Sequence, residues 1–66
     1  MEINVNGQTR QVQSRASIAE LLSEMNITAR HVAVEVNLAL VPREQHATHT
    51  LSPGDRLEVV TLVGGG

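Results

Sequence analysis

Hydrophobic and polar residues alternate at the start of the chain. Residues 2–6 read E-I-N-V-N, in which two aliphatic residues stand between polar neighbours. This period-2 pattern predicts a strand with one buried face. Asn6-Gly7 follows, and both residues tolerate the positive φ angles of a tight hairpin turn. Residues 8–13 are mostly polar, so we predict that they return as a second strand at a sheet edge.

The next segment has the period of a helix. Ser17 and Glu20 match the S-x-x-E capping box, in which hydroxyl and carboxylate each satisfy an unpaired backbone N–H. Apolar residues then recur at spacings of three and four and predict one buried stripe. The residues of this stripe are Ile18, Leu21, Leu22 and Met25. We expect Asn26 to cap the helix end, with Ile27 folding back onto the last turn.

The second half of the chain predicts three more strands. Residues 32–36 (V-A-V-E-V) indicate a buried strand, and residues 38–41 a short one after a turn at Asn37. Pro42 lacks an N–H and ends or edges that strand. The remaining segments are a polar stretch expected to form a helical turn (43–50), the turn signal S-P-G-D (52–55) and the strongest predicted strand (56–63).

The order of predicted elements is strand, strand, helix, strand, strand, turn, strand. One helix cannot cover two sheets, so a single mixed sheet of four to five strands packed on that helix is the economical arrangement. This is an α+β fold of the β-grasp, or ubiquitin-like, type. We assign residues 1–63 to the domain and residues 64–66 to a flexible glycine tail.

Composition narrows the function classes. The chain has 66 residues, enough for one domain, with no cysteine and no aromatic residue, so its core must be aliphatic. A net charge of −2 and the lack of stacking rings argue against nucleic-acid binding. No run is long enough to span a membrane, and no signal peptide is evident. We expect a cytoplasmic protein that is a monomer on its own.

Recognisable catalytic and metal-binding motifs are missing. Glu20 and Glu24 lie one helical turn apart, but a solvated helix face explains them better than acid–base chemistry. His46 and His49 have the H-x-x-H spacing of two zinc ligands, whereas a zinc site needs three or four. We therefore expect a surface role for both histidines and no bound metal. His31 flanks a strand without an evident partner.

The chain ends in Gly64-Gly65-Gly66. Glycines contribute no packing, so a frayed terminus is one interpretation of this tail. The other is that side-chain-free residues let a terminal carboxylate thread a narrow channel and approach a nucleotide closely. Composition leaves both interpretations open.

Alternation divides the last strand between two faces. Those faces are Leu57, Val59 and Thr61 toward the helix, and Glu58, Val60 and Leu62 on the open side. Aliphatic residues exposed beside the tail predict a docking surface for partner proteins. The alternative is that Leu62 and Val63 only complete the core.

The order of short motifs resembles the ThiS sulfur carriers of thiamin biosynthesis over essentially the whole chain. The matching segments are I-x-V-N-G at 3–7, Leu21-Leu22, V-A-V-E-V-N at 32–37, V-P-R-E at 41–44, G-D at 54–55 and V-G-G-G at 63–66. Many members of this family have tryptophan where this chain has His46, so the packing at that position is expected to differ.

The resemblance implies a sulfur carrier, not an enzyme. An E1-like adenylyltransferase (ThiF-like) would use ATP and magnesium to adenylate the carboxylate of Gly66, with Gly64 and Gly65 threading the tail. A persulfide donor would convert it to a thiocarboxylate, and thiazole synthase (ThiG-like) would take the sulfur. Alternatives are a MoaD-like carrier for molybdopterin, a carrier for tRNA thiolation or protein tagging, and a ubiquitin-like binding module without covalent chemistry.

Overall fold

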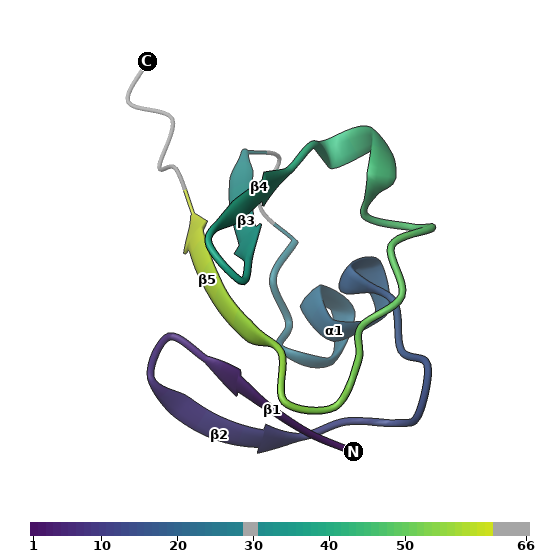
Figure 1. The fold of residues 1–66 in the computed structure, drawn as a ribbon. Coiled ribbons are helices and arrows are strands. Elements are labelled where there is room, and N and C mark those ends of the chain that lie inside the picture. The colour runs from purple at the N-terminus through teal and green to yellow at the C-terminus, as the bar shows by residue number, and fades with distance from the viewer. Residues whose placement is uncertain (29–30, 62–66) are drawn as a thin grey trace.

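A computed structural model describes residues 1–28 and 31–61. Its five strands form one mixed sheet in the order β2-β1-β5-β3-β4, and the predicted sheet of four to five strands with one helix is confirmed (Figure 1). The elements are β1 (Glu2–Val5), β2 (Gln8–Gln11), α1 (Ile18–Glu24), β3 (Val32–Val36), β4 (Ala39–Val41), the 3₁₀ helix η1 (Arg43–Gln45) and β5 (Arg56–Thr61).

The strand nearest the C-terminus occupies the centre of the sheet. β5 pairs in parallel with β1, where Val5 lies opposite Leu57, and antiparallel with β3 from Val32–Thr61 to Val36–Leu57. A parallel pair needs a long crossover, and here the helix and the second hairpin lie between β1 and β5 in the chain. The last strand is therefore held on both sides at its start.

The first hairpin follows the sequence prediction, except at its end. Its two turn residues have positive φ angles, 52° at Asn6 and 84° at Gly7, and β2 lies at the sheet edge as predicted. β2 stops at Gln11 and not at residue 13. Val12 instead turns into the core, and its N–H donates to the Met1 carbonyl at 2.9 Å.

The helix begins where the capping box places it. The Ser17 N–H donates to Glu20 Oε1 at 2.9 Å, and the Glu20 N–H donates to Ser17 Oγ at 3.1 Å. α1 has only seven residues, fewer than an isolated helix needs for stability in water. Packing of its buried residues (Ile18, Leu21 and Leu22) must therefore stabilise it.

The helix ends one residue before the predicted cap. Met25 is the cap, and Asn26 follows with a φ of 58°. The Ile27 N–H donates to the Leu22 carbonyl and the Asn26 N–H to the Ser23 carbonyl, at 2.9 and 3.0 Å. This pair of bonds is a Schellman motif, so the predicted fold-back of Ile27 is confirmed, and Ile27 packs against the core.

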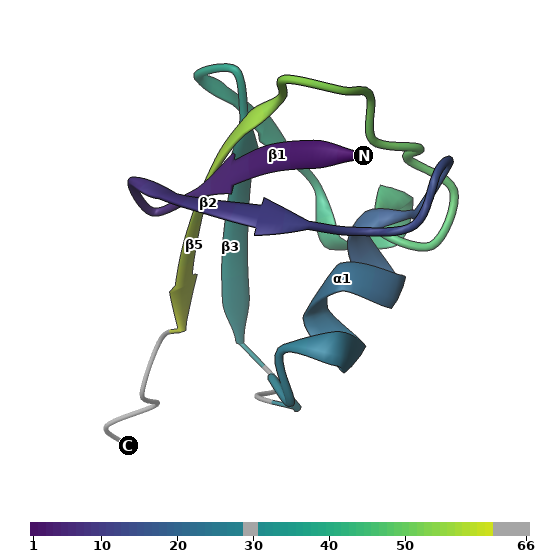
Figure 2. The same cartoon turned by 90° about the horizontal axis from the view of Figure 1, so that it is seen from below.

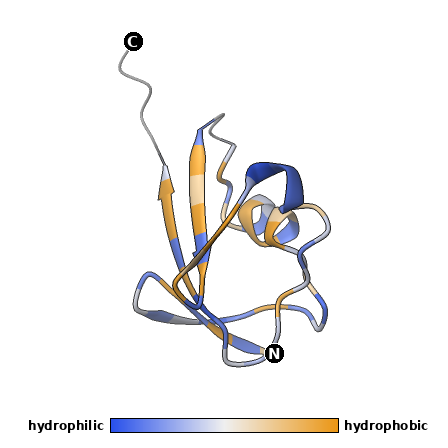
Figure 3. Ribbon diagram, turned by 45° about the horizontal axis from the view of Figure 1, so that its top comes forward, coloured by the Kyte–Doolittle hydropathy of each residue, from blue (hydrophilic) through white to orange (hydrophobic). Residues whose placement is uncertain are grey.

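The core lies between α1 and one face of the curved sheet (Figure 2). Apolar stretches of β3, β5 and α1 mark it in Figure 3. It consists of Ile3, Val5, Val12, Ala16, Ile18, Leu21, Leu22, Val34, Val36, Val41, Leu51, Leu57 and Val59. We call the sheet surface away from α1 the open face. Over residues 1–28 and 31–61, no helix is long and apolar enough to cross a bilayer; the cytoplasmic location stays a prediction.

Candidate functional site

Two asparagine side chains hold β5, the strand that leads toward the C-terminus. The first is Asn6, whose backbone N–H donates to the Leu57 carbonyl at 2.9 Å and so continues the β1–β5 ladder. Its side chain extends that ladder: Nδ2 donates to the Val59 carbonyl at 3.1 Å, and Oδ1 accepts from the Val59 N–H at 2.8 Å. The carboxamide thus replaces a peptide group after β1 has turned away.

The second asparagine, Asn37, fixes the start of the same strand. The Arg56 N–H donates to Asn37 Oδ1 at 3.0 Å, and Asn37 Nδ2 donates to Asp55 Oδ1 at 3.0 Å. Asp55 in turn accepts from the Ser52 N–H at 2.8 Å and closes the S-P-G-D turn. Beyond Val59, β5 is paired only with β3 among the described residues.

The two faces of β5 are those predicted from alternation. Leu57 and Val59 are buried against the helix, whereas Glu58 and Val60 are exposed on the open face. Thr61 is also exposed because it lies at the strand end. These positions agree with the predicted docking surface, although its binding role stays a prediction.

Two further exposed leucines were missed by the sequence reasoning. Residues 38–41 were expected to form a strand, but β4 starts at Ala39 because Leu38 occupies the turn with a φ of 72°. Leu40 lies opposite Glu35 in the β3–β4 register and is exposed on the open face. A two-residue turn beginning at Asn37 would have indicated both positions.

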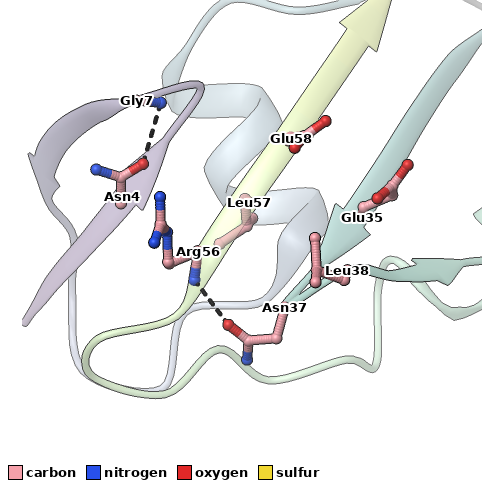
Figure 4. Close-up of a pocket in the computed structure, with 8 residues that line it drawn as sticks. All are labelled: Asn4, Gly7, Glu35, Asn37, Leu38, Arg56, Leu57 and Glu58. Carbon is pink, nitrogen blue, oxygen red and sulfur yellow. Dashed lines mark hydrogen bonds between the residues drawn. The ribbon is translucent and has the colours of Figure 1, made fainter.

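A depression of about 410 Å³ lies on the open face between the two hairpin turns (Figure 4). Its lining residues are Asn4, Gly7, Glu35, Asn37, Leu38, Arg56, Leu57 and Glu58. Two of them, Glu35 and Glu58, are directly opposite each other on neighbouring strands. The depression therefore combines an exposed aliphatic side chain with two carboxylates and the guanidinium of Arg56.

The H-x-x-H segment supports the helix, and the predicted surface role is wrong for His46. That ring is 6% exposed, and its Nε2 lies 3.0 Å from the Val41 carbonyl. The carbonyls of His46 and His49 accept from the N–H groups of Ala19 and Ile18 at 2.9 and 3.1 Å. These N–H groups have no partner within the helix, so the segment completes the cap begun by Ser17.

Metal binding finds no support among the described residues. No group of three or more histidine, cysteine, aspartate or glutamate side chains in residues 1–28 and 31–61 is placed to hold an ion. His49 is partly exposed and His31 is exposed. Glu20 is occupied by the capping box, which gives this carboxylate a structural role.

The predicted sulfur-carrying terminus lies outside the described residues. Leu62, Gly64, Gly65 and Gly66 all belong to that segment. Their roles, and the domain boundary after residue 63, stay predictions. The described part of the molecule shows how firmly the preceding strand is held.

Known proteins match the chain over its whole length. The family model that matches, over residues 3–66, is that of the ThiS family. The sulfur carrier protein ThiS of Escherichia coli is 32% identical over 66 residues, which cover 100% of both chains. A thiazole synthase of Paramagnetospirillum magneticum is 38% identical over all of this chain, which spans 20% of that protein's length.

A solved structure agrees with these sequence matches. The crystal structure of a thiamine biosynthesis protein (ThiS) from Geobacter metallireducens superposes with a TM-score of 0.85 at 33% identity, and covers 100% of each chain. Fold and sequence therefore agree along the full length, glycine end included in the family match. The chain belongs to the ThiS family.

Proposed function

We propose that this protein is a sulfur carrier for thiazole formation in thiamin biosynthesis, with sulfur held as a thiocarboxylate on Gly66. The full-length match to a ThiS sulfur carrier is the observation that carries the proposal. The fold supports it, because the side chains of Asn6 and Asn37 fix β5, whose last residue, Thr61, is five positions before Gly66. A firmly held strand gives partner enzymes a rigid surface to bind close to the C-terminal residues.

The chemistry divides between the chain and its partners. The Gly66 carboxylate attacks the α-phosphate of ATP on an E1-like adenylyltransferase, with magnesium held there, and pyrophosphate leaves. A persulfide then attacks the acyl carbon and displaces AMP. A second thiol cleaves the resulting acyl disulfide and leaves the thiocarboxylate. The chain acts as a co-substrate: it supplies the carboxylate, and Gly64 and Gly65 let it reach both sites.

Three partners follow from this scheme. Thiazole synthase is favoured as the sulfur acceptor because a protein of that name contains a region similar to this entire chain. The E1-like enzyme and the persulfide donor are required by the chemistry. We place a docking contact for partner proteins on the end of β5, where Glu58 and Val60 are exposed, and extend it to Leu62.

Intact-mass measurement tests the proposal. Incubation with the E1-like enzyme, ATP, magnesium and a sulfide source should add the mass difference between one sulfur and one oxygen atom. Deletion of Gly66, or Gly65→Val, should abolish the mass change, because no carboxylate then reaches the nucleotide in the right place. Gly54→Ala is unsuitable as a control, since Gly54 has a φ of 83°; Thr9→Ala on the edge strand serves instead.

An unchanged wild-type mass with active partner enzymes would contradict the carrier proposal and favour a non-covalent binding module. Sulfuration followed by transfer to a molybdopterin precursor or tRNA, and not to thiazole synthase, would assign the chain to another acceptor.

A further inference from the structure

The exposed large aliphatic side chains of the described residues all lie on the open face or at its edge. They are Leu38, Leu40 and Val60, which are 87%, 66% and 51% exposed. Leu40 and Val60 project from the open face, opposite Glu35 and Ala33 in the register. Leu38 borders the depression on the same face (Figure 4). Single exposed leucines are ordinary, whereas a group on one surface indicates an interaction site.

Leu38 is the least expected of the three. Its φ of 72° is a left-handed conformation that bulky side chains rarely adopt. Packing against the described residues offsets little of this strain, because the side chain is 87% exposed and therefore adds little to the core. Asparagine or glycine would fit the turn better. A contact with another molecule would explain why a leucine occupies the position.

Two carboxylates lie among these aliphatic residues. Glu35 and Glu58 are directly opposite each other on β3 and β5, where like charges repel. Both also line the depression beside Leu38. Arg56 also lines the depression, so its charged side chains sum to −1. Charge complementarity therefore favours a partner that presents an excess of arginine or lysine within an apolar surface.

We propose that Leu38, Leu40 and Val60, with Glu35 and Glu58 between them, form the docking surface for thiazole synthase. This inference rests on the proposed function, which supplies the synthase as a partner. Thiazole synthase is chosen as the occupant because the Paramagnetospirillum magneticum protein of that name has the equivalent of this chain within one polypeptide. Covalent linkage within one polypeptide raises the effective concentration of the two parts. A small docking surface of this kind would therefore suffice for binding in that protein.

The geometry limits where the synthase can react with the tail. Leu38 lies at the start of β5, about 17 Å along the strand from Thr61 at 3.3 Å per residue. Gly66, the proposed sulfur-bearing residue, is five positions beyond Thr61, a span of at most about 18 Å. The synthase site that accepts sulfur must therefore lie within that reach of the β5 end, while Leu38 is held at the opposite end of the sheet.

Two substitutions at Leu38 separate docking from backbone strain. Leu38→Ala keeps a side chain that disfavours the positive φ, whereas Leu38→Asn suits it. Each should weaken the Kd for purified thiazole synthase by about tenfold or more, the loss expected for one buried leucine. Only Leu38→Asn should also raise Tm. If both variants bind as tightly as wild type, Leu38 is merely a strained surface residue and the proposal is overturned.

Glutamine substitutions test whether the two carboxylates contribute to synthase binding. Glu35→Gln and Glu58→Gln should each weaken synthase binding and reduce its dependence on salt. Glu24→Gln removes the same charge from the helix end, on the other layer, and should leave Kd within about twofold. Equal effects of all three variants would show long-range attraction only and would contradict a cationic contact at this surface.

These binding assays use protein that has not been sulfurated, so docking and carrier chemistry are judged separately. Wild-type protein that is sulfurated but does not bind the synthase overturns the docking surface and leaves the carrier chemistry standing. Protein that binds through Leu38 but is never sulfurated contradicts the proposed function and supports the surface.

Discussion

Both hairpin turns of this protein hold β5 through an asparagine side chain, but the two turns differ in their second residue. Asn6-Gly7 joins β1 to β2, and Asn37-Leu38 joins β3 to β4, with positive φ at all four residues. Both asparagine side chains bind β5, and both second residues line the depression on the open face. Glycine suits the second position of such a turn, whereas leucine is strained and exposed.

This difference in the second residue separates a turn that serves folding alone from a turn that also exposes a side chain for binding. In the first, both residues suit the positive φ angles of the turn, and glycine adds no side chain to the surface. In the second, the same asparagine role is kept, but a local preference is violated by Leu38. Natural sequences tend to violate local rules at functional positions. The comparison therefore supports a binding role for the second turn.

Removing a core side chain from the part of β5 that both turns hold should have the largest effect. Leu57 is 1% exposed and lies on β5 between the strand contacts made by Asn6 and Asn37. Leu57→Ala should cost about 2–5 kcal/mol, comparable with the ~3–5 kcal/mol that a core of this size supplies. Loss of the cooperative thermal transition in circular dichroism is expected. A folded variant with nearly unchanged Tm would show that the two turns hold β5 without this core contact.

The two asparagines should differ in their contribution to stability. Glycine tolerates their positive φ, so Asn6→Gly and Asn37→Gly remove the side-chain bonds without backbone strain, and the entropy that glycine adds to the unfolded chain is similar in both variants. We expect a loss of about 2–3 kcal/mol for Asn6, whose two bonds to Val59 are partly buried, and about 1 kcal/mol for Asn37, whose bonds are exposed. Urea unfolding measures both. A larger loss of stability for Asn37→Gly than for Asn6→Gly would contradict the expectation that Asn6 contributes more to stability.

Exchanging the second turn residues should give smaller effects than the loss of the Asn6 side chain, with opposite signs. A Cβ at Gly7 would meet nothing within 4 Å, so Gly7→Leu should cost only the conformational ~1–2 kcal/mol. Leu38→Gly should stabilise by about 0.5–1 kcal/mol, because the entropy of glycine in the unfolded chain offsets part of the relief. Differential scanning calorimetry would record Tm shifts of several degrees. Destabilisation by Leu38→Gly would mean that the leucine packs usefully in the isolated domain.

Local sequence signals predicted the elements well. The Asn-Gly turn, the capping box and the alternation of β5 each depend on neighbouring residues, and all appear in the structure. Errors arose where distant contacts compete with local pattern. Val12 left the edge strand for the core, and Leu38 was placed in a strand although the register puts it in the turn.

The site was predicted less completely than the fold. Glu58 and Val60 followed from alternation, but Leu38 and Leu40 needed the β3–β4 register. His46 was expected at the surface because its neighbours in the chain are polar. It is buried because η1 packs against β3 and brings the ring to the Val41 carbonyl.

By itself, the sequence determined the set of elements, the helix start and the alternating faces of β5, because these follow from residues within a few positions of one another. It also carried the family resemblance along the whole chain. Only the tertiary structure decided that the last strand lies between the first and third, and that Asn6 reaches Val59, 53 positions away. Such contacts depend on how the layers pack, and no local pattern encodes their partners.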